Sequence, residues 1–194
     1  FFFLLFHTNA YAEYIEQPKP KNFIVAVAHP LAAQAGIEIL DKGGSATDAA
    51  IAIQAVLGLV EPQSSGIAGG GFILHYDASA DELTSWDGRE TAPSAITPEI
   101  FSNRAGTLEG FIKAMTSTDA VGVPGIPALL ETVHKKYGRL DWAGLYSPAI
   151  KLATEGFKIT PRLHYLLSAD PFIQNSPSAR SIFFIQPDDK DKIL

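Results

Sequence analysis

Apolar residues recur along the chain at two spacings, one typical of strands and the other of helices. An unbroken apolar run at 23–28 predicts an inner strand, because a strand covered on both faces has no polar positions. Helical spacing over 30–42 predicts a helix of about three turns, which the glycine pair at 43–44 ends. A second helix over 45–60 opens with Ser and Asp at capping-box spacing and is apolar nearly all round, so it must be buried.

The middle of the chain predicts a β-hairpin. A glycine-rich loop at 64–71 leads into strands at 72–77 and 83–87, with a turn between them. Prolines and polar residues dominate 88–119, where we expect only one helical turn, at 98–101. The remaining elements that we expect are a short strand at 120–125, helices at 127–137, at 141–156 and from Pro161, and extended chain after Ser176. This alternation predicts a layered α/β or α+β fold.

The first 12 residues have the features of an export signal. An apolar run at 1–6 is followed by a small-x-small pattern that ends at Ala12, as signal peptidase requires. We therefore expect cleavage after Ala12, a linker at 13–22, a main domain at 23–194, and a periplasmic or secreted protein. The alternative is a buried hydrophobic segment at the N-terminus. No other apolar stretch reaches the ~18 residues of a membrane-spanning helix, so no membrane contact is expected beyond the signal.

Composition and charge narrow the class of protein. The chain of 194 residues is 46% hydrophobic and 19% charged, which is typical of a globular domain. Its formal net charge is −6 and its basic residues are scattered, which disfavours nucleic acid as a partner because phosphates require a clustered basic face. The chain has no cysteine, so neither a disulfide framework nor a thiol nucleophile can form within it.

Arg89 is the candidate binding residue. It lies in the segment 87–93, Asp-Gly-Arg-Glu-Thr-Ala-Pro, directly after a predicted strand. A guanidinium at a strand end can bind a carboxylate through two parallel N–H bonds. The alternative is a local surface ion pair with Asp87 or Glu90, which would explain the same residues without a ligand.

Other chemistry is disfavoured by spacing. The glycine loop at 64–71 follows a helix and opens a strand, whereas a nucleotide-binding glycine loop follows a strand and opens a helix. Close backbone approach is the better explanation of those glycines. No Gly-x-Ser-x-Gly elbow is present, and no histidines have metal-ligand spacing. We therefore expect no metal, no cofactor and no complete catalytic unit. The histidines considered are His7, His29, His75, His134 and His164.

Several segments, taken in order, resemble the γ-glutamyltransferase family, the enzymes of glutathione breakdown. Each segment is weakly specific alone, but the ordered set extends over about 23–184 and is highly specific. Ala68 stands where the family usually has a glycine. The matching segments are 28–36 (Ala-His-Pro-Leu-Ala-Ala-Gln-Ala-Gly), 43–50 (Gly-Gly-Ser-Ala-Thr-Asp-Ala-Ala), 61–72, 87–93, 121–125, 137–140 and 148–157.

The resemblance implies an N-terminal-nucleophile hydrolase fold, with four αββα layers, of which this chain would be an incomplete part. It implies a precursor that cleaves itself into a large and a small subunit. The chain would be the N-terminal portion of the large subunit, with the small subunit as its partner. It also implies that Arg89 binds the α-carboxylate of the γ-glutamyl group of glutathione and related small-molecule substrates.

The family's catalytic threonine is the first residue of the small subunit, and no threonine of this chain has its Thr-Thr-His context. The resemblance therefore implies no catalytic residue in this chain, and we expect the 194 residues alone to be inactive. Two alternatives stay open. The chain could belong to a related amide acylase of the same fold, acting for example on a β-lactam side chain. It could instead be a non-catalytic truncated remnant.

Overall fold

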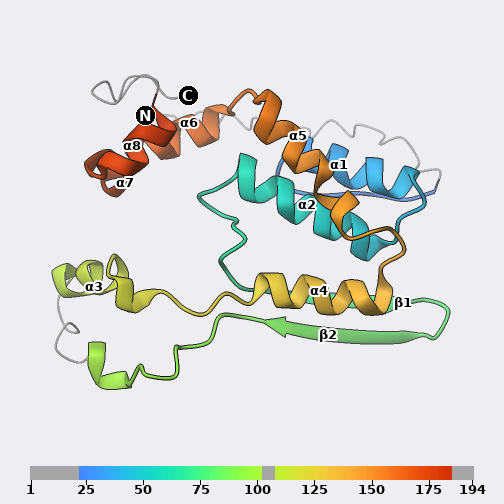
Figure 1. Ribbon diagram of the computed structural model, residues 1–194, viewed down its shortest axis with the longest axis horizontal. Helices are drawn as coiled ribbons and strands as arrows, with labels where there is room; N and C mark the ends of the chain where they lie inside the picture. The colour runs from blue at the N-terminus through green and yellow to red at the C-terminus, as the bar shows by residue number, and fades with distance from the viewer. Residues whose placement is uncertain (1–21, 102–107, 185–194) are drawn as a thin grey trace, which may run out of the picture.

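The computed structural model describes residues 22–101 and 108–184, and its first feature is a packed pair of helices (Figure 1). Helix α1 (Pro30–Asp41) and helix α2 (Ala46–Val60) lie side by side, as the apolar spacing predicted. Gly43 joins them with a φ of 85°, a conformation that favours glycine. The predicted capping box is present, because Ser45 and Asp48 each accept a hydrogen bond from the other's backbone N–H.

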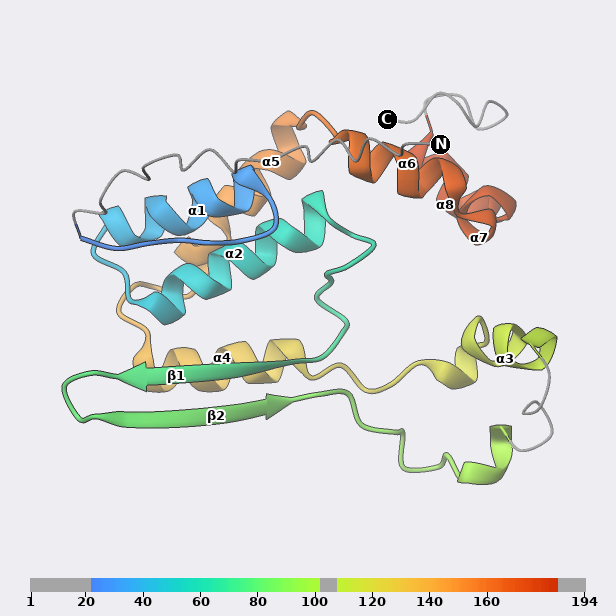
Figure 2. The ribbon, with the colours of Figure 1, turned by 180° about the vertical axis from the view of Figure 1, so that it is seen from behind.

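The predicted hairpin is confirmed. Strands β1 (Gly71–Asp77) and β2 (Glu82–Gly88) pair antiparallel, with Gly71 opposite Gly88 and Ile73 opposite Trp86. Helix α4 (Ile126–Tyr137) lies between α2 and the hairpin, as both ribbon views show (Figures 1 and 2). The arrangement is therefore layered, with the helix pair, α4 and the hairpin in turn.

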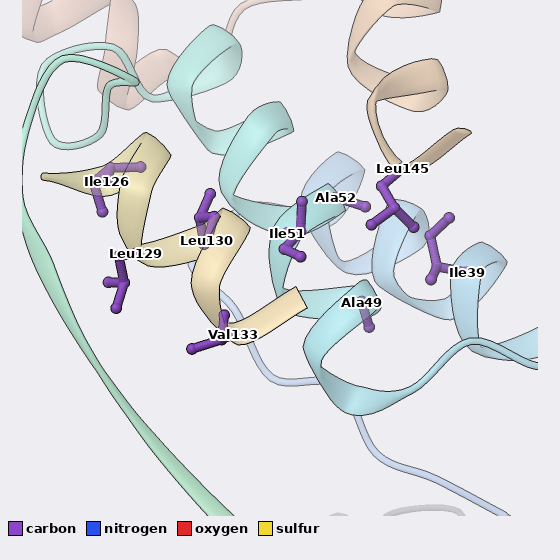
Figure 3. Packing of buried hydrophobic residues seen from close by; sticks show 9 residues of the cluster. All are labelled: Ile39, Ala49, Ile51, Ala52, Ile126, Leu129, Leu130, Val133 and Leu145. Carbon is purple, nitrogen blue, oxygen red and sulfur yellow. The ribbon is translucent and has the colours of Figure 1, made fainter. Parts of the chain in front are cut away.

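The main core extends from α1 past α2 to α4 (Figure 3). Alternate residues of the hairpin, among them Ile73 and Trp86, pack against it from the strand side. The opposite face of the hairpin is bare, since Phe72 and Leu74 are 66% and 73% exposed. The nine buried residues of this core are Ile39, Ala49, Ile51, Ala52, Ile126, Leu129, Leu130, Val133 and Leu145.

The last described part of the chain is helical. Helix α5 (Ser147–Glu155) packs on α2, while Leu163, Leu167 and Phe184 form a separate small core with their neighbours. The helices around that core are α6 (Pro161–Ala169), α7 (Pro171–Asn175) and α8 (Pro177–Phe183). Short 3-10 turns lie at η1 (Pro98–Phe101), η2 (Thr118–Ala120) and η3 (Ala143–Tyr146).

The structure corrects four expectations from the sequence. The run at 23–28 alternates in burial like a strand but pairs with no strand among the described residues. The strand expected at 120–125 is reduced to one bridge, between Thr91 and Val123. The helix expected at 141–156 is divided into η3 and α5. Helix α3 (Leu108–Met115) and helix α8 form where no helix was expected.

The export signal at 1–12 and nearly all of the linker at 13–22 lie outside the described residues. Among the helices that the structure does describe, none combines the length and the apolar character needed to cross a bilayer.

Candidate functional site

Three segments cross at the end of β2 and fix the position of Arg89. The Gly69 carbonyl accepts hydrogen bonds from the N–H groups of Gly125, at 3.1 Å, and Ile126, at 3.0 Å. These bonds tie the glycine loop to the start of α4. The start of α4 also touches β2, because a Cβ at Gly125 would overlap the carbonyl oxygen of Gly88. Backbone contacts therefore fix the point at which Arg89 follows the last residue of β2.

Gly125→Ala should open this crossing and destabilise the protein by about 2 kcal/mol, the usual cost of overpacking a tight contact. The neighbours at Gly125 are backbone atoms, which cannot rotate away as a flexible side chain can. Urea denaturation measures the loss. Gly144→Ala is the matched control, because a Cβ at Gly144 meets nothing within 4 Å. Equal midpoints for the two variants would contradict the tight crossing.

Arg89 is exposed and lines a groove of about 280 Å³ between the end of β2 and α4. Its backbone N–H donates to the Asp87 carboxylate at 2.9 Å, but within the described ranges its guanidinium pairs with no carboxylate. The local ion pair with Asp87 or Glu90 is therefore not formed. The arrangement leaves a cation and its N–H donors available to an anionic ligand.

Glu90 points to the other side of the strand end. It lines a larger pocket, of about 490 Å³, whose other wall is the loop from Pro62 to Gly71. A Cβ at Gly70 would collide with the Glu90 side chain and lie 2.7 Å from its backbone nitrogen. The close backbone approach predicted for the glycine loop is confirmed at this position. Arg89 and Glu90 are adjacent in sequence but line two different cavities.

Two buried carboxylates form tertiary contacts that the sequence analysis did not predict. Asp48 is fully buried, and its Oδ2 accepts the backbone N–H groups of Arg139 at 2.9 Å and Leu140 at 3.2 Å. Glu61 is 4% exposed and is paired with Arg162. The sequence shows the capping role of Asp48, but no local pattern indicates the other contacts.

The histidines of the described residues do not form a cluster, and His7 lies outside those residues. His29 caps α1 through its Nδ1, which accepts the Leu31 N–H, while His75 stacks on the ring of Tyr137. In the part of the chain that the structure describes, no three His, Asp or Glu residues are placed to hold a metal ion.

Comparison with known proteins gives a family match. The sequence profile described as Gamma-glutamyltranspeptidase matches residues 32–192. The chain is 40% identical over 175 residues to the glutathione hydrolase proenzyme of Bacillus subtilis, covering 90% of this chain and 30% of that protein. It therefore spans about 30% of the length of that relative.

Solved structures of two enzymes are similar to the chain. The Helicobacter pylori gamma-glutamyltranspeptidase matches with a TM-score of 0.77 and 34% identity, over 88% of this chain and 48% of that one. The cephalosporin acylase of Bacillus halodurans matches with a TM-score of 0.61 and 31% identity, over 80% of this chain and 30% of that one.

The mixed helical and strand layers and these structural matches define the chain as part of an N-terminal-nucleophile hydrolase, as the resemblance implied. Within that class, the match over 32–192 and the identity to the Bacillus subtilis protein are decisive. The chain belongs to the gamma-glutamyltranspeptidase family.

Proposed function

We propose that the full-length protein removes γ-glutamyl groups from glutathione and other γ-glutamyl amides and passes them to water or to an acceptor amine. Family membership supports the reaction class. The observation that carries the substrate proposal is the guanidinium of Arg89, which lines a groove and pairs with no carboxylate among residues 22–101 and 108–184.

Arg89 would bind the α-carboxylate of the donor through two charge-assisted N–H bonds. These two bonds would hold one end of the γ-glutamyl group, so that the side-chain amide of the donor takes a fixed position relative to an attacking group. That attacking group is proposed to be a threonine hydroxyl of the small subunit, activated by its own α-amine. The hydroxyl oxygen would bond to the amide carbon, and the amine would leave with a proton. Water or an acceptor amine would then take the acyl group and free the threonine.

Processing and location are part of the same proposal. The partner would be the small subunit of the same precursor, and export to the periplasm or the medium would depend on the signal at 1–12. The 194 residues alone would not cleave the donor, since the group that attacks would come from the partner.

An amide acylase is the second candidate, and the match to the cephalosporin acylase of Bacillus halodurans favours it. Such an enzyme does not require a cation for an α-carboxylate. The guanidinium of Arg89, which has no carboxylate partner in the described part of the chain, therefore favours the γ-glutamyl substrate over this alternative.

A pair of anilides tests the proposal in the full-length protein. The γ-glutamyl anilide should be cleaved with a kcat/KM about 100-fold above that of the 4-aminobutanoyl anilide, which lacks only the α-carboxylate. Equal cleavage of the two, or preference for the second, would favour the acylase. Cleavage of neither would favour the non-catalytic alternative.

A further inference from the structure

The carboxylate of Glu61 is buried at the end of α2, where the loop to the hairpin begins. Its side chain is 5% exposed, and its Oε2 accepts hydrogen bonds from Gln63 Nε2 and Arg162 Nη1. Its backbone carbonyl accepts the N–H groups of Ser64 and Ser65, each at 3.0 Å. Glu61 is therefore bonded through both its side chain and its backbone to the first turn of the loop.

A carboxylate this deeply buried is costly unless a cation compensates it. Arg162 is the cation that the structure places there, and it comes from α6, 101 residues further along the chain. Helix α6 has its own core, with Leu163 and Leu167, which is separate from the main core. The ion pair is thus a charged link between two hydrophobic units.

The loop that Glu61 begins leads to the site of Arg89. Its residues from Pro62 to Gly71 form the wall of the pocket that Glu90 lines. Near its far end, the Gly69 carbonyl accepts the N–H groups of Gly125, which precedes α4, and of Ile126, its first residue, and so fixes the crossing beside Arg89. Arg162 is therefore bonded to the residue that begins the loop, and the backbone of the loop leads from there to the crossing beside the groove.

We propose that Arg162 is a positioning residue for the γ-glutamyl site: by neutralising buried Glu61 it holds the 61–71 loop, and through the loop it holds the crossing that orients Arg89. This proposal rests on the proposed function. It assigns Arg162 no contact with the substrate, because Arg162 lines neither cavity beside the strand end.

The test is a double-mutant cycle in the full-length protein, with kcat and KM measured on the γ-glutamyl anilide. Arg162→Ala should raise KM about 10-fold, because it leaves a buried carboxylate without its cation and the loop must shift to hydrate it. Arg162→Lys should restore most of the affinity. In the Glu61→Gln background, where no buried charge remains, Arg162→Ala should raise KM less than about twofold.

The effect on KM separates positioning from general stabilisation. A purely structural role would lower the folded fraction, and with it the apparent kcat, while KM stayed unchanged. Lys135→Ala is the matched control, because Lys135 forms an exposed pair with Glu131 at 2.6 Å, which contributes little.

The proposal is overturned if Arg162→Ala raises KM no more than Lys135→Ala, or equally in both backgrounds. If the unmodified protein cleaves no γ-glutamyl anilide, the proposed function itself fails and the positioning role falls with it. If the unmodified protein cleaves it and only the cycle is additive, the positioning role alone is wrong.

Discussion

Arg89→Ala in the full-length protein is expected to raise KM for a γ-glutamyl substrate by about 100-fold, since a two-bond contact between a guanidinium and a carboxylate contributes about 3 kcal/mol. The groove would lose the one cation that it offers among the described residues. Steady-state kinetics on the γ-glutamyl anilide measure the effect. Donor binding should suffer more than turnover, because the guanidinium contacts the end of the donor remote from the amide that is cleaved.

Three controls make this prediction specific. Arg89→Lys should recover part of the affinity, since an ammonium keeps the charge but loses the planar pair of donors. Arg139→Ala removes another exposed guanidinium, one that lines a different cavity, and should leave KM unchanged. Arg89→Ala should also cleave the γ-glutamyl and 4-aminobutanoyl anilides alike. A wild-type KM in Arg89→Ala would remove the basis of the proposed function.

Asp48→Ala should give the largest loss of stability, about 3 kcal/mol, because it leaves three partly buried N–H groups without their acceptor. The Asp48 carboxylate accepts from the backbone of Ser45 at 2.8 Å and also from Arg139 and Leu140. It joins the start of α2 to the chain that leaves α4. The urea midpoint of the full-length protein should fall accordingly.

Asp41→Ala is the matched control for Asp48→Ala. Asp41 is an exposed acid at the last position of α1, so its loss should change the midpoint very little. If the two variants had similar midpoints, the contacts of Asp48 would contribute little to the fold.

The elements that the sequence predicted correctly carry their signals locally. The helices at 30–42 and 45–60 have their own spacing, caps and glycine stop, and the hairpin has alternating residues on either side of a turn. The helix after Ser176 was missed although a local signal exists, since Ser176 caps it and a proline follows at the first helical position. The segment at 23–28 could not be settled locally, because a strand is defined by a neighbour and the described residues supply none.

The candidate site, too, could be predicted from the sequence only where its signals are local. Arg89 could be selected from its place after a strand and from the motif around it. The absence of an ion-pair partner for its guanidinium among the described residues could not be predicted, because Asp87 and Glu90 are close enough in sequence to pair with it. In the structure, Asp87 accepts the backbone N–H of Arg89 and Glu90 lines the other pocket. The ion pair of Glu61 with Arg162 spans 101 residues, and no local pattern indicates a contact over that separation.

The contact between Gly88 and Gly125 has a consequence for protein engineering. Gly88 and Gly125 both line the Arg89 groove and meet through their backbones, so at this contact there is no side chain to trim and no room for a larger one. The walls of the groove include Ala128 and Thr132, which are exposed and one turn apart on α4. Under the proposed function, bulkier residues at these two positions would narrow the groove and leave Arg89 in place, so the range of donors that fit would be adjustable from α4.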